Sequence, residues 1–411
     1  MGFSFVENEK SARIKVVGVG GAGGNAVNNM IDSNLQGVKF IVANTDAQAL
    51  DISRAELKIQ LGAGLTEGLG AGANPSVGRE AALENLEDIR AALTDSHMVF
   101  ITAGFGGGTG TGAAPVIAEI CKELGVLTVA VVTKPFSFEG SKRAKQAREG
   151  VEQLRDITDT VITIPNDRLR GIASKGAKMI DMFIKADEIL HHSVKGITDL
   201  IMVPGLVNLD FADVRTTMSQ AGMALMGIGI SSGENRATEA AERAISHPLL
   251  EDISISGARA VLLNITSSSD LTLDEMTEAS DRIHQEVGDD AEIIWGQAID
   301  ESLGDEMRVT VIATGIGQEE MAEKSNVRRL DAPKFQKEAR EEREKNIGNE
   351  VFARGHLREP TEEELSSWSE DEPVRITSKK AVGQDGRNSY RGFDFDCEDL
   401  EIPTFLRKKA D

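Results

Sequence analysis

Few cysteines, few aromatic residues and no long apolar run characterise this sequence. Its 411 residues include two cysteines, Cys121 and Cys397. Neither has a partner at metal-ligand spacing, which excludes a zinc site built on cysteine pairs and argues against a disulfide, and Cys121 is expected in the core. The longest uncharged stretch, residues 97–118, contains several glycines and a proline, so it predicts a strand, a loop and a helix start rather than a membrane span.

A cationic surface is also missing. The formal net charge is −22 and the sequence pI is about 4.8. Such a surface repels phosphate backbones and anionic lipids, which excludes nucleic acid as a partner and argues against direct membrane insertion. Residues 1–11 are mixed polar and do not form the apolar core of a signal peptide, so a cytoplasmic protein is expected.

The pattern along the chain predicts an α/β protein with two folded parts and a tail. Short β-branched runs alternate with helical stretches in the first part, at 14–19, 39–43, 99–102, 127–132 and 160–164. Such continuous apolar runs are typical of a parallel sheet covered by helices on both faces.

A smaller α/β domain is predicted after a long central helix. It contains strand-like runs at 260–265, 292–295 and 308–312, and a helix that begins at a capping box of Thr272 and Glu275. The charge-rich segment that follows lacks a core-forming period. The expected organisation is an N-terminal extension (1–12), a parallel-sheet nucleotide-binding domain (13–177), a central connecting helix (178–203), a smaller α/β domain (204–317), a disordered linker (318–390) and a docking peptide (391–411).

The first glycine-rich segment directly follows the first predicted strand. Gly18, Gly20 and Gly23 fit the G-x-G-x-x-G pattern, and Asp46 ends the second strand at the distance expected of a ribose-binding acid. Glycines there let the backbone approach a phosphate at a helix N-terminus. Taken alone, the segment predicts a dinucleotide-dependent oxidoreductase as readily as any other nucleotide-binding protein.

A second glycine-rich segment favours a different nucleotide. Residues 106–112 read Gly-Gly-Gly-Thr-Gly-Thr-Gly between a strand and a helix, far more glycine than a turn requires. We interpret it as a second phosphate cradle, in which backbone N–H groups and threonine hydroxyls surround a di- or triphosphate. A Walker A lysine is absent, and an oxidoreductase leaves this second cradle without a role.

These residues resemble the tubulin and FtsZ family of GTPases. The resemblance covers residues 13–317 and returns in the last residues of the chain. It implies a polymerising GTPase of bacterial cell division, in a ring at the mid-cell division site, with GTP or GDP and Mg²⁺ as cofactors. The further motifs that carry it are Asn-Thr-Asp at 44–46, Gly-Ala-Gly-Ala-Asn-Pro at 70–75, Pro-Phe-Ser-Phe-Glu-Gly at 135–140, Ile-Pro-Asn-Asp at 164–167 and Asn-Leu-Asp-Phe-Ala-Asp at 208–213.

The same resemblance implies the residues that bind the nucleotide. Asp187 also has a reason of its own, because a carboxylate accepts both the N1–H and the exocyclic amine of guanine, and it lies one helical turn after Phe183. No protein ligand for the metal is identified, although Asp46 is a candidate for indirect contact. The implied nucleotide-binding residues are Gly21, Ala22, Gly23, Gly24, Asn25, Gly72, Ala73, Gly107, Gly108, Thr109, Gly110, Glu139, Arg143, Asn166, Phe183 and Asp187.

Two acids, Asp210 and Asp213, follow the long helix and are too far from its start to reach the nucleotide of their own chain. One interpretation is that Asp210 only caps the next helix. The other, compatible with the first, is catalysis in trans, in which Asp210 and Asp213 act on the nucleotide of the next subunit and Asn208 shapes their loop. A head-to-tail contact of this kind does not close and generates filaments.

Apolar residues return at the end of the chain, in the peptide from Asp399 to Arg407. It resembles the tail by which FtsZ-like proteins dock on membrane-tethering and regulatory division proteins. Binding of anionic lipid through Arg407, Lys408 and Lys409 is the alternative. For the whole chain, the alternatives to a polymerising GTPase are an oxidoreductase, which leaves most motifs unused, and a GTP-binding scaffold without catalysis, which leaves Asp210 and Asp213 without a function.

Overall fold

The computed structural model describes residues 12–316 apart from 173–175, 204, 206–208, 220–221, 251–254, 256 and 289–290. The predicted linker at 318–390, the docking peptide at 391–411 and Asn208 lie outside the described residues. The described residues belong to one compact unit, 1–331.

Ten strands of the described part form one sheet, in the order β3-β2-β1-β4-β5-β6-β7-β10-β8-β9. Pairing is parallel from β3 to β7 and between β8 and β9, whereas β10 pairs antiparallel with both β7 and β8. The mostly parallel sheet predicted from the apolar runs is therefore confirmed. The strands are β1 (Ile14–Val19), β2 (Val38–Asn44), β3 (Leu57–Gln60), β4 (Met98–Gly104), β5 (Leu127–Lys134), β6 (Thr160–Pro165), β7 (Gly222–Ser232), β8 (Ala260–Ser267), β9 (Glu292–Ile299) and β10 (Glu306–Ile316).

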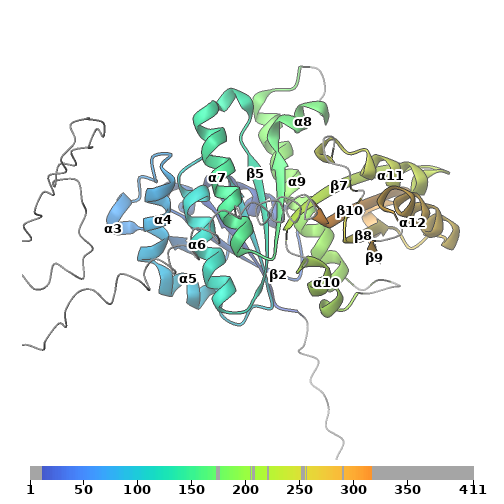
Figure 1. Cartoon of the computed structure of the whole chain (residues 1–411), viewed down its shortest axis with the longest axis horizontal. Coiled ribbons are helices and arrows are strands. Elements are labelled where there is room, and N and C mark those ends of the chain that lie inside the picture. Colours follow the sequence, from blue (N-terminus) through green and yellow to red (C-terminus); the bar gives the residue numbers. More distant parts are fainter. Residues whose placement is uncertain are drawn as a thin grey trace, which may run out of the picture. The chain divides into compact units, whose positions relative to one another are not determined.

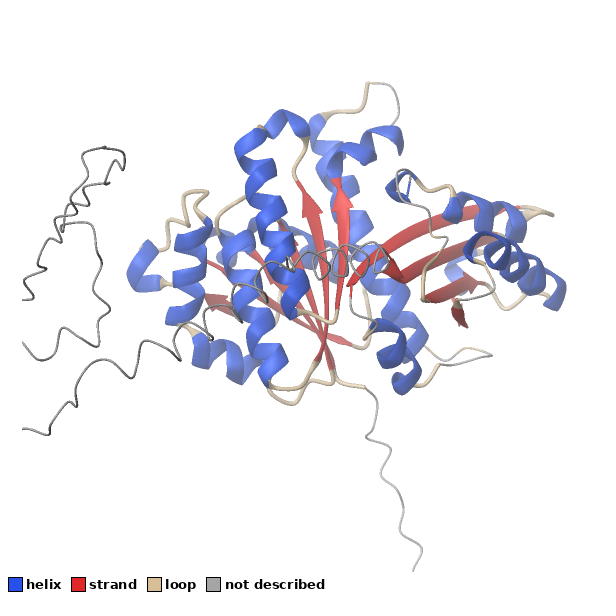
Figure 2. Ribbon diagram, viewed as in Figure 1, coloured by secondary structure: helices blue, strands red, loops and turns tan. Residues whose placement is uncertain are grey.

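Helices cover both faces of this sheet (Figures 1 and 2). The long helix α9 (Met179–Met202) matches the predicted central helix, and Lys178 is its N-cap. The other helices are α1 (Gly20–Asp32), α2 (Ala47–Asp51), α3 (Ala63–Thr66), α4 (Pro75–Glu84), α5 (Leu86–Leu93), α6 (Thr109–Glu123), α7 (Ser141–Ile157), α8 (Asn166–Ile172), α10 (Phe211–Met218), α11 (Arg236–Ile245) and α12 (Leu273–Val287), with 3₁₀ turns η1 (Ser137–Glu139), η2 (Pro248–Leu250) and η3 (Glu301–Leu303).

Alternate residues of the central strands belong to different cores, which explains their continuous apolar runs. In β1, Val16 packs in the cluster that includes α9, whereas Val17 and Val19 pack in the cluster on the other face, with α6. A strand buried on both faces has no polar side. Cys121 is buried in the second cluster, as expected, and burial raises the pKa of its thiol to about 12.

Two strands, β3 and β7, are missing from the sequence prediction. In β7 the reason is glycine, because Gly227 and Gly229 break the β-branched pattern that marks a strand. A Cβ atom built on Gly227 or Gly229 would lie 2.0 Å or 1.8 Å from a carbonyl oxygen of α11. These glycines therefore let the helix pack directly on the strand backbone.

Two predicted helix starts are confirmed. The Thr272 hydroxyl accepts from the Glu275 N–H, and the Glu275 carboxylate accepts in turn from the Thr272 N–H, which completes the capping box of α12. Asp210 is the N-cap of α10, and its Oδ1 accepts from the N–H of Asp213 at 3.0 Å. Asp210 therefore has the capping role, whatever further role it has.

Candidate functional site: a nucleotide pocket at the centre of the sheet

Both glycine-rich segments lie at the point where the strand order reverses. The first follows β1 and the second follows β4, and these strands are neighbours at the centre of the parallel part of the sheet. From β1 the sheet continues to β2 and β3 on one side, and from β4 it continues to β5 and β6 on the other. Ligands of open α/β sheets bind at the carboxyl ends of the strands at such a point.

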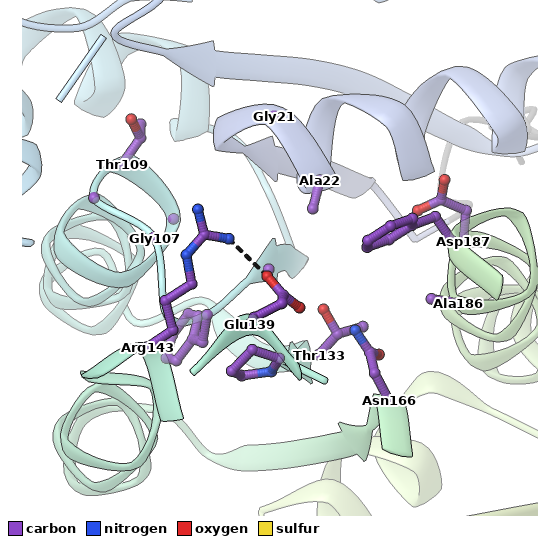
Figure 3. Close-up of a pocket in the computed structure, with 16 residues that line it drawn as sticks. Gly21, Ala22, Gly107, Thr109, Thr133, Glu139, Arg143, Asn166, Ala186 and Asp187 are labelled. Atoms are coloured by element: carbon purple, nitrogen blue, oxygen red, sulfur yellow. Dashed lines mark hydrogen bonds and ion pairs between the residues drawn. The ribbon is translucent and has the colours of Figure 1, made fainter. Parts of the chain in front are cut away.

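A pocket of about 420 Å³ opens there, between the two glycine segments and α9 (Figure 3). In the close-up, Gly107, Thr109 and Arg143 lie on one side of the pocket, and Asn166, Ala186 and Asp187 lie on the other. The predicted residues that line it are Gly21, Ala22, Gly107, Gly108, Thr109, Gly110, Glu139, Arg143, Asn166, Phe183 and Asp187.

Two glycines of the pocket face open space. A Cβ atom built on Gly21 or Gly107 would meet no other atom within 4 Å, and neither residue has a positive φ. A side chain at either position would therefore be tolerated by the protein but would occupy the volume of the pocket. This is the behaviour expected of a backbone that approaches a phosphate closely.

Other glycines of the same segments serve to pack the protein. A Cβ atom on Gly112 would lie 2.0 Å from the Pro75 carbonyl oxygen, and one on Gly23 would lie 2.3 Å from the Thr102 carbonyl oxygen. The interpretation of residues 106–112 as a cradle is thus too broad, because Gly112 allows α6 to contact α4. Position 106 is a glycine for a third reason, since its φ of 101° lies in the left-handed region that favours glycine.

The two threonines of the second segment also differ. Thr109 lines the pocket, and its hydroxyl lies 2.6 Å from the hydroxyl of Thr45, the residue after β2. The Thr111 hydroxyl instead accepts from the Gly106 N–H at 2.9 Å and holds the loop in place. Only Thr109 of the pair is thus available to a ligand in this pocket.

Glu139 and Arg143 are paired with each other across one turn. Arg143 Nη1 lies 2.6 Å from Glu139 Oε2, and Glu139 Oε1 accepts from the Phe136 N–H at 2.9 Å (Figure 3). Both oxygens of Glu139 are therefore engaged within the protein. A nucleotide would share this pair, with hydroxyl groups facing the carboxylate and phosphate facing the guanidinium.

The α9 side of the pocket is made of side chains. The Phe183 ring meets the buried Phe136 ring edge to face, with centroids 5.5 Å apart, and Phe183 remains 37% exposed. Burial raises the pKa of Asp187 to about 7. The Oδ1 atom of buried Asn166 has no hydrogen-bond partner among the described residues. A half-exposed ring, a poorly solvated carboxylate and an unpaired amide oxygen together fit a purine base with its own donors.

Several predicted residues do not line the pocket, namely Gly23, Gly24, Asn25, Gly72 and Ala73. Gly72 and Ala73 belong to a loop, and each has a φ of 58°. This loop lies next to the second glycine segment, since a Cβ atom built on Gly108 would lie 2.8 Å from the Ala71 Cβ. The sequence prediction omitted other lining residues, Gly104, Phe105, Thr133, Pro135 and Ala186. Gly104 and Thr133 stand at the carboxyl ends of β4 and β5, a position that could have identified them.

Ala22 carries a methyl group among the glycines of the first segment, and the fold leaves room for it. Ala22 lies inside α1 and is not among the residues of positive φ. The methyl group lies against Gly104, where an added Cβ atom would be only 2.6 Å away. The Cβ atom of Ala22 therefore fits because Gly104 has no Cβ atom.

The acids Asp210 and Asp213 lie at the other end of α9 from the pocket. Asp187 contributes to the pocket near the start of α9, and α10 follows its C-terminal end at Met202 (Figure 1). Both acids are exposed. Within the described residues, no group of three or more His, Cys, Asp or Glu side chains is placed to hold a metal ion, and no helix is long and apolar enough to cross a membrane.

Comparison with known families agrees with this geometry. The model described as "Tubulin/FtsZ family, GTPase domain" matches residues 13–174, and that described as "FtsZ family, C-terminal domain" matches residues 222–317. The cell division protein FtsZ of Pseudomonas aeruginosa is 48% identical over 413 residues, which cover 100% of both chains. The chain belongs to the FtsZ family. It is a GTPase of this cell-division family and binds GTP and GDP, which confirms the resemblance seen in the sequence.

Two solved structures have the same fold. The empty FtsZ dimer of M. jannaschii is 47% identical, with a TM-score of 0.73, over 76% of this chain and 90% of that chain. CetZ1 from Haloferax volcanii, a GDP-bound monomer, is 20% identical with a TM-score of 0.65, over 74% of this chain and 94% of that chain, and shows the fold alone. The predicted fold class is thus confirmed.

Proposed function

We propose that the chain polymerises head to tail and that each GTPase site is completed by the acids of the neighbouring subunit. The observation that supports this is the separation of the pocket from Asp210 and Asp213 by the length of α9. From Asp187 to Met202 the helix rises roughly 23 Å, at 1.5 Å per residue. A carboxylate beyond Met202 is out of reach of a γ-phosphate in its own pocket, whereas a subunit stacked on the pocket brings its acids to it.

In this arrangement the acids orient and deprotonate the attacking water. Asp210 Oδ1 is occupied by the Asp213 N–H, and the carboxylate of Asp213 has no hydrogen bond or ion pair among the described residues. Asp213 is therefore the better general base, and Asp210 fixes the start of α10 that carries it. Asn208 would shape the loop before them.

A contact between the pocket of one subunit and the acidic loop of the next is heterologous and repeats without closing. Such contacts produce filaments. The relative from M. jannaschii is described as a dimer, which is consistent with self-association in the family. We infer that filaments of this chain form the contractile ring at the division site, in the cytoplasm, and that loss of the γ-phosphate weakens the contact.

Mg²⁺ would be held mainly by the phosphates and by water. Thr109 lines the pocket, and Asp46 uses Oδ1 to cap α2, which leaves Oδ2 for a water ligand of the ion. These oxygen donors fit a hard cation that keeps several waters. When bound, the ion neutralises charge on the transferred phosphoryl group. The sequence has no Walker A lysine to do this.

The first test is GTP hydrolysis as a function of protein concentration, with light scattering from the same samples. Activity per molecule is expected to rise above a threshold concentration at which scattering also appears. Constant specific activity without scattering would mean that the site is complete within one chain.

The second test identifies which subunit supplies the carboxylate. Asp213→Ala protein is loaded with GTP labelled at the γ-phosphate, freed of unbound nucleotide, and mixed with excess wild type loaded with unlabelled GTP. In trans, the wild-type neighbour supplies Asp213, so label is released at a near wild-type rate, whereas Asp213→Ala protein alone releases it slowly. Retention of label in the mixture would place Asp213 in cis or remove it from catalysis.

We also propose that the peptide from Asp399 to Arg407 docks on membrane-tethering and regulatory division proteins. Its apolar residues, Leu400, Ile402, Phe405 and Leu406, are the anchors. Deletion of residues 399–411 should leave polymerisation intact and abolish partner binding. Flotation of the full chain with anionic vesicles, lost on substitution of Arg407, Lys408 and Lys409, would support the lipid alternative instead.

A further inference from the structure

A second cavity of about 430 Å³ lies where α9 meets β7 and the C-terminal end of α11. Its apolar part consists of Ile189 on α9 with Ile228 and Ile230 on β7. Ile230 is 37% exposed although it belongs to a central strand of the sheet. The cavity thus leaves aliphatic surface in contact with solvent inside a folded part of the chain.

Cationic and hydrogen-bonding side chains surround this aliphatic surface. Lys185 lies on α9 and Arg243 on α11, and no acidic residue is among the described residues that line the cavity. Each cation has an acidic partner on its own helix, Glu188 at 2.8 Å from Lys185 and Glu239 at 3.0 Å from Arg243. The side chains of Lys185 and Arg243 remain 42% and 57% exposed, so both stay available to a further anion.

Two histidines add donors without adding charge. His247 Nδ1 accepts from the Leu249 N–H at 3.3 Å, so a neutral ring carries its proton on Nε2. Burial, with Lys185 nearby, lowers the pKa of His247 to about 4. Burial also lowers the pKa of His192 to about 3, with smaller contributions from Arg308, His191, Lys185 and Lys195. Burial is the larger cause of both shifts, and only the smaller contribution from the neighbouring cations favours an anion.

We propose that this cavity binds a small amphipathic anion, with its carboxylate between Lys185, Arg243 and His247 and its aliphatic body on Ile189, Ile228 and Ile230. The cavity volume is within the range of small-molecule sites. The chain carries a net charge of −22, so a cavity whose described lining includes two cations and no acid differs from the average surface. That difference in charge identifies the occupant as an anion.

The site is separate from the nucleotide pocket, although both use one segment of α9. Ala186 and Asp187 line the nucleotide pocket, whereas Lys185 and Ile189 line the second cavity. The proposal therefore does not depend on how GTP is hydrolysed. It is tested on the full chain saturated with GDP, which excludes binding of the probe in the nucleotide pocket.

Octanoate is the probe, measured by isothermal titration calorimetry below its aggregation concentration. We expect one octanoate per chain. Octan-1-ol, which has the same body without the charge, should bind about tenfold more weakly. The double substitution Lys185→Gln and Arg243→Gln should weaken octanoate about tenfold and leave octanol unchanged, since partly exposed ion pairs contribute modestly. Lys58→Gln, a change at a distant exposed lysine, is the matched control.

A second variant tests the apolar half independently. Ile230→Ala should weaken octanoate and octanol by a similar factor of about three to ten, because both lose the same aliphatic contact. Thermal unfolding of each variant without probe verifies that it folds. The proposal is overturned if octanoate does not saturate, if octanol binds equally well, or if the double substitution leaves octanoate affinity unchanged.

Discussion

The two sides of the nucleotide pocket differ in kind, because one is formed by backbone and the other by side chains. The side that we propose for the phosphates consists of backbone, at Gly21 and at Gly107 to Gly110, held by glycines packed against neighbouring elements. The α9 side, which we propose for the base, consists of side chains, Phe183 and Asp187, one helical turn apart. The phosphate side has its shape before any nucleotide binds, whereas the base side depends on the charge state and rotamers of individual residues.

This difference teaches that substitutions should fail in different ways on the two sides. On the phosphate side an added methyl group clashes either with the protein or with the ligand, depending on which way the glycine faces. On the base side a substitution changes hydrogen bonding and charge while the backbone stays in place. The predictions below separate these outcomes, from the largest expected effect to the smallest.

Gly112→Ala should destabilise the folded protein most. The added Cβ would lie 2.0 Å from the Pro75 carbonyl and 2.6 Å from the Arg79 nitrogen, both backbone atoms of α4 that move only if the helices separate. We expect a loss of about 3 kcal/mol in the free energy of unfolding, measured with urea, at the upper end for overpacking. A change below 1 kcal/mol would show that α4 and α6 part easily.

Gly107→Ala should instead leave stability nearly unchanged and weaken nucleotide binding. The position faces open space and has no positive φ, so the free energy of unfolding should change by less than about 1 kcal/mol. The methyl group would stand in the pocket, and we expect GTP affinity to fall about a hundredfold, measured by equilibrium binding. Wild-type affinity in a stable Gly107→Ala protein would place the phosphates elsewhere.

Gly104→Ala tests a contact between the end of β4 and helix α1. Its Cβ would lie 2.6 Å from the Ala22 Cβ, and we expect a loss of about 2 kcal/mol in the free energy of unfolding. Ala22→Gly alone should cost up to about 1 kcal/mol, as glycine does in a helix. The double variant should be more stable than Gly104→Ala, because the clash is gone. Additive losses would mean that the two positions do not meet.

The sequence predicts the parallel part of the fold well because most of those strands are continuous runs of apolar, β-branched residues. Residues 14–19 are predicted and observed as a strand, and α9 begins one residue after its predicted start. Strand β7 escapes prediction because its glycines serve the packing of α11, which depends on a segment distant in the sequence. Local patterns therefore report burial, whereas close backbone contacts between distant segments leave no local pattern.

The same limit applies to the site. The glycine content of residues 106–112 predicts a phosphate cradle, but the sequence does not distinguish Gly107, which faces the pocket, from Gly112, which faces α4. The roles of Glu139 and Arg143 come only from the resemblance, since their pairing depends on the turn η1. Asp187 has a chemical argument of its own within the sequence, and the structure places it in the pocket.

Asp187 provides the most specific prediction, because it concerns the pH dependence of stability and of binding. Its pKa in the folded chain is about 7, above the value of about 3.9 in an unfolded chain. The folded, nucleotide-free protein therefore binds more protons than the unfolded chain between these values, and its stability should fall as pH rises from 4 to 7 and then level off. Asp187→Asn should flatten that profile, measured by thermal unfolding.

Binding of GTP should have the opposite dependence on pH, because only the ionised carboxylate accepts both donors of guanine. With a pKa of about 7 for Asp187, the affinity of the wild type should rise up to about tenfold from pH 6 to pH 8. The γ-phosphate titrates in part of this range, so the informative quantity is the ratio of wild-type to Asp187→Asn affinity at each pH. A ratio that does not change with pH would show that Asp187 does not read the base through its charge, and the base side would then resemble the phosphate side in depending on shape alone.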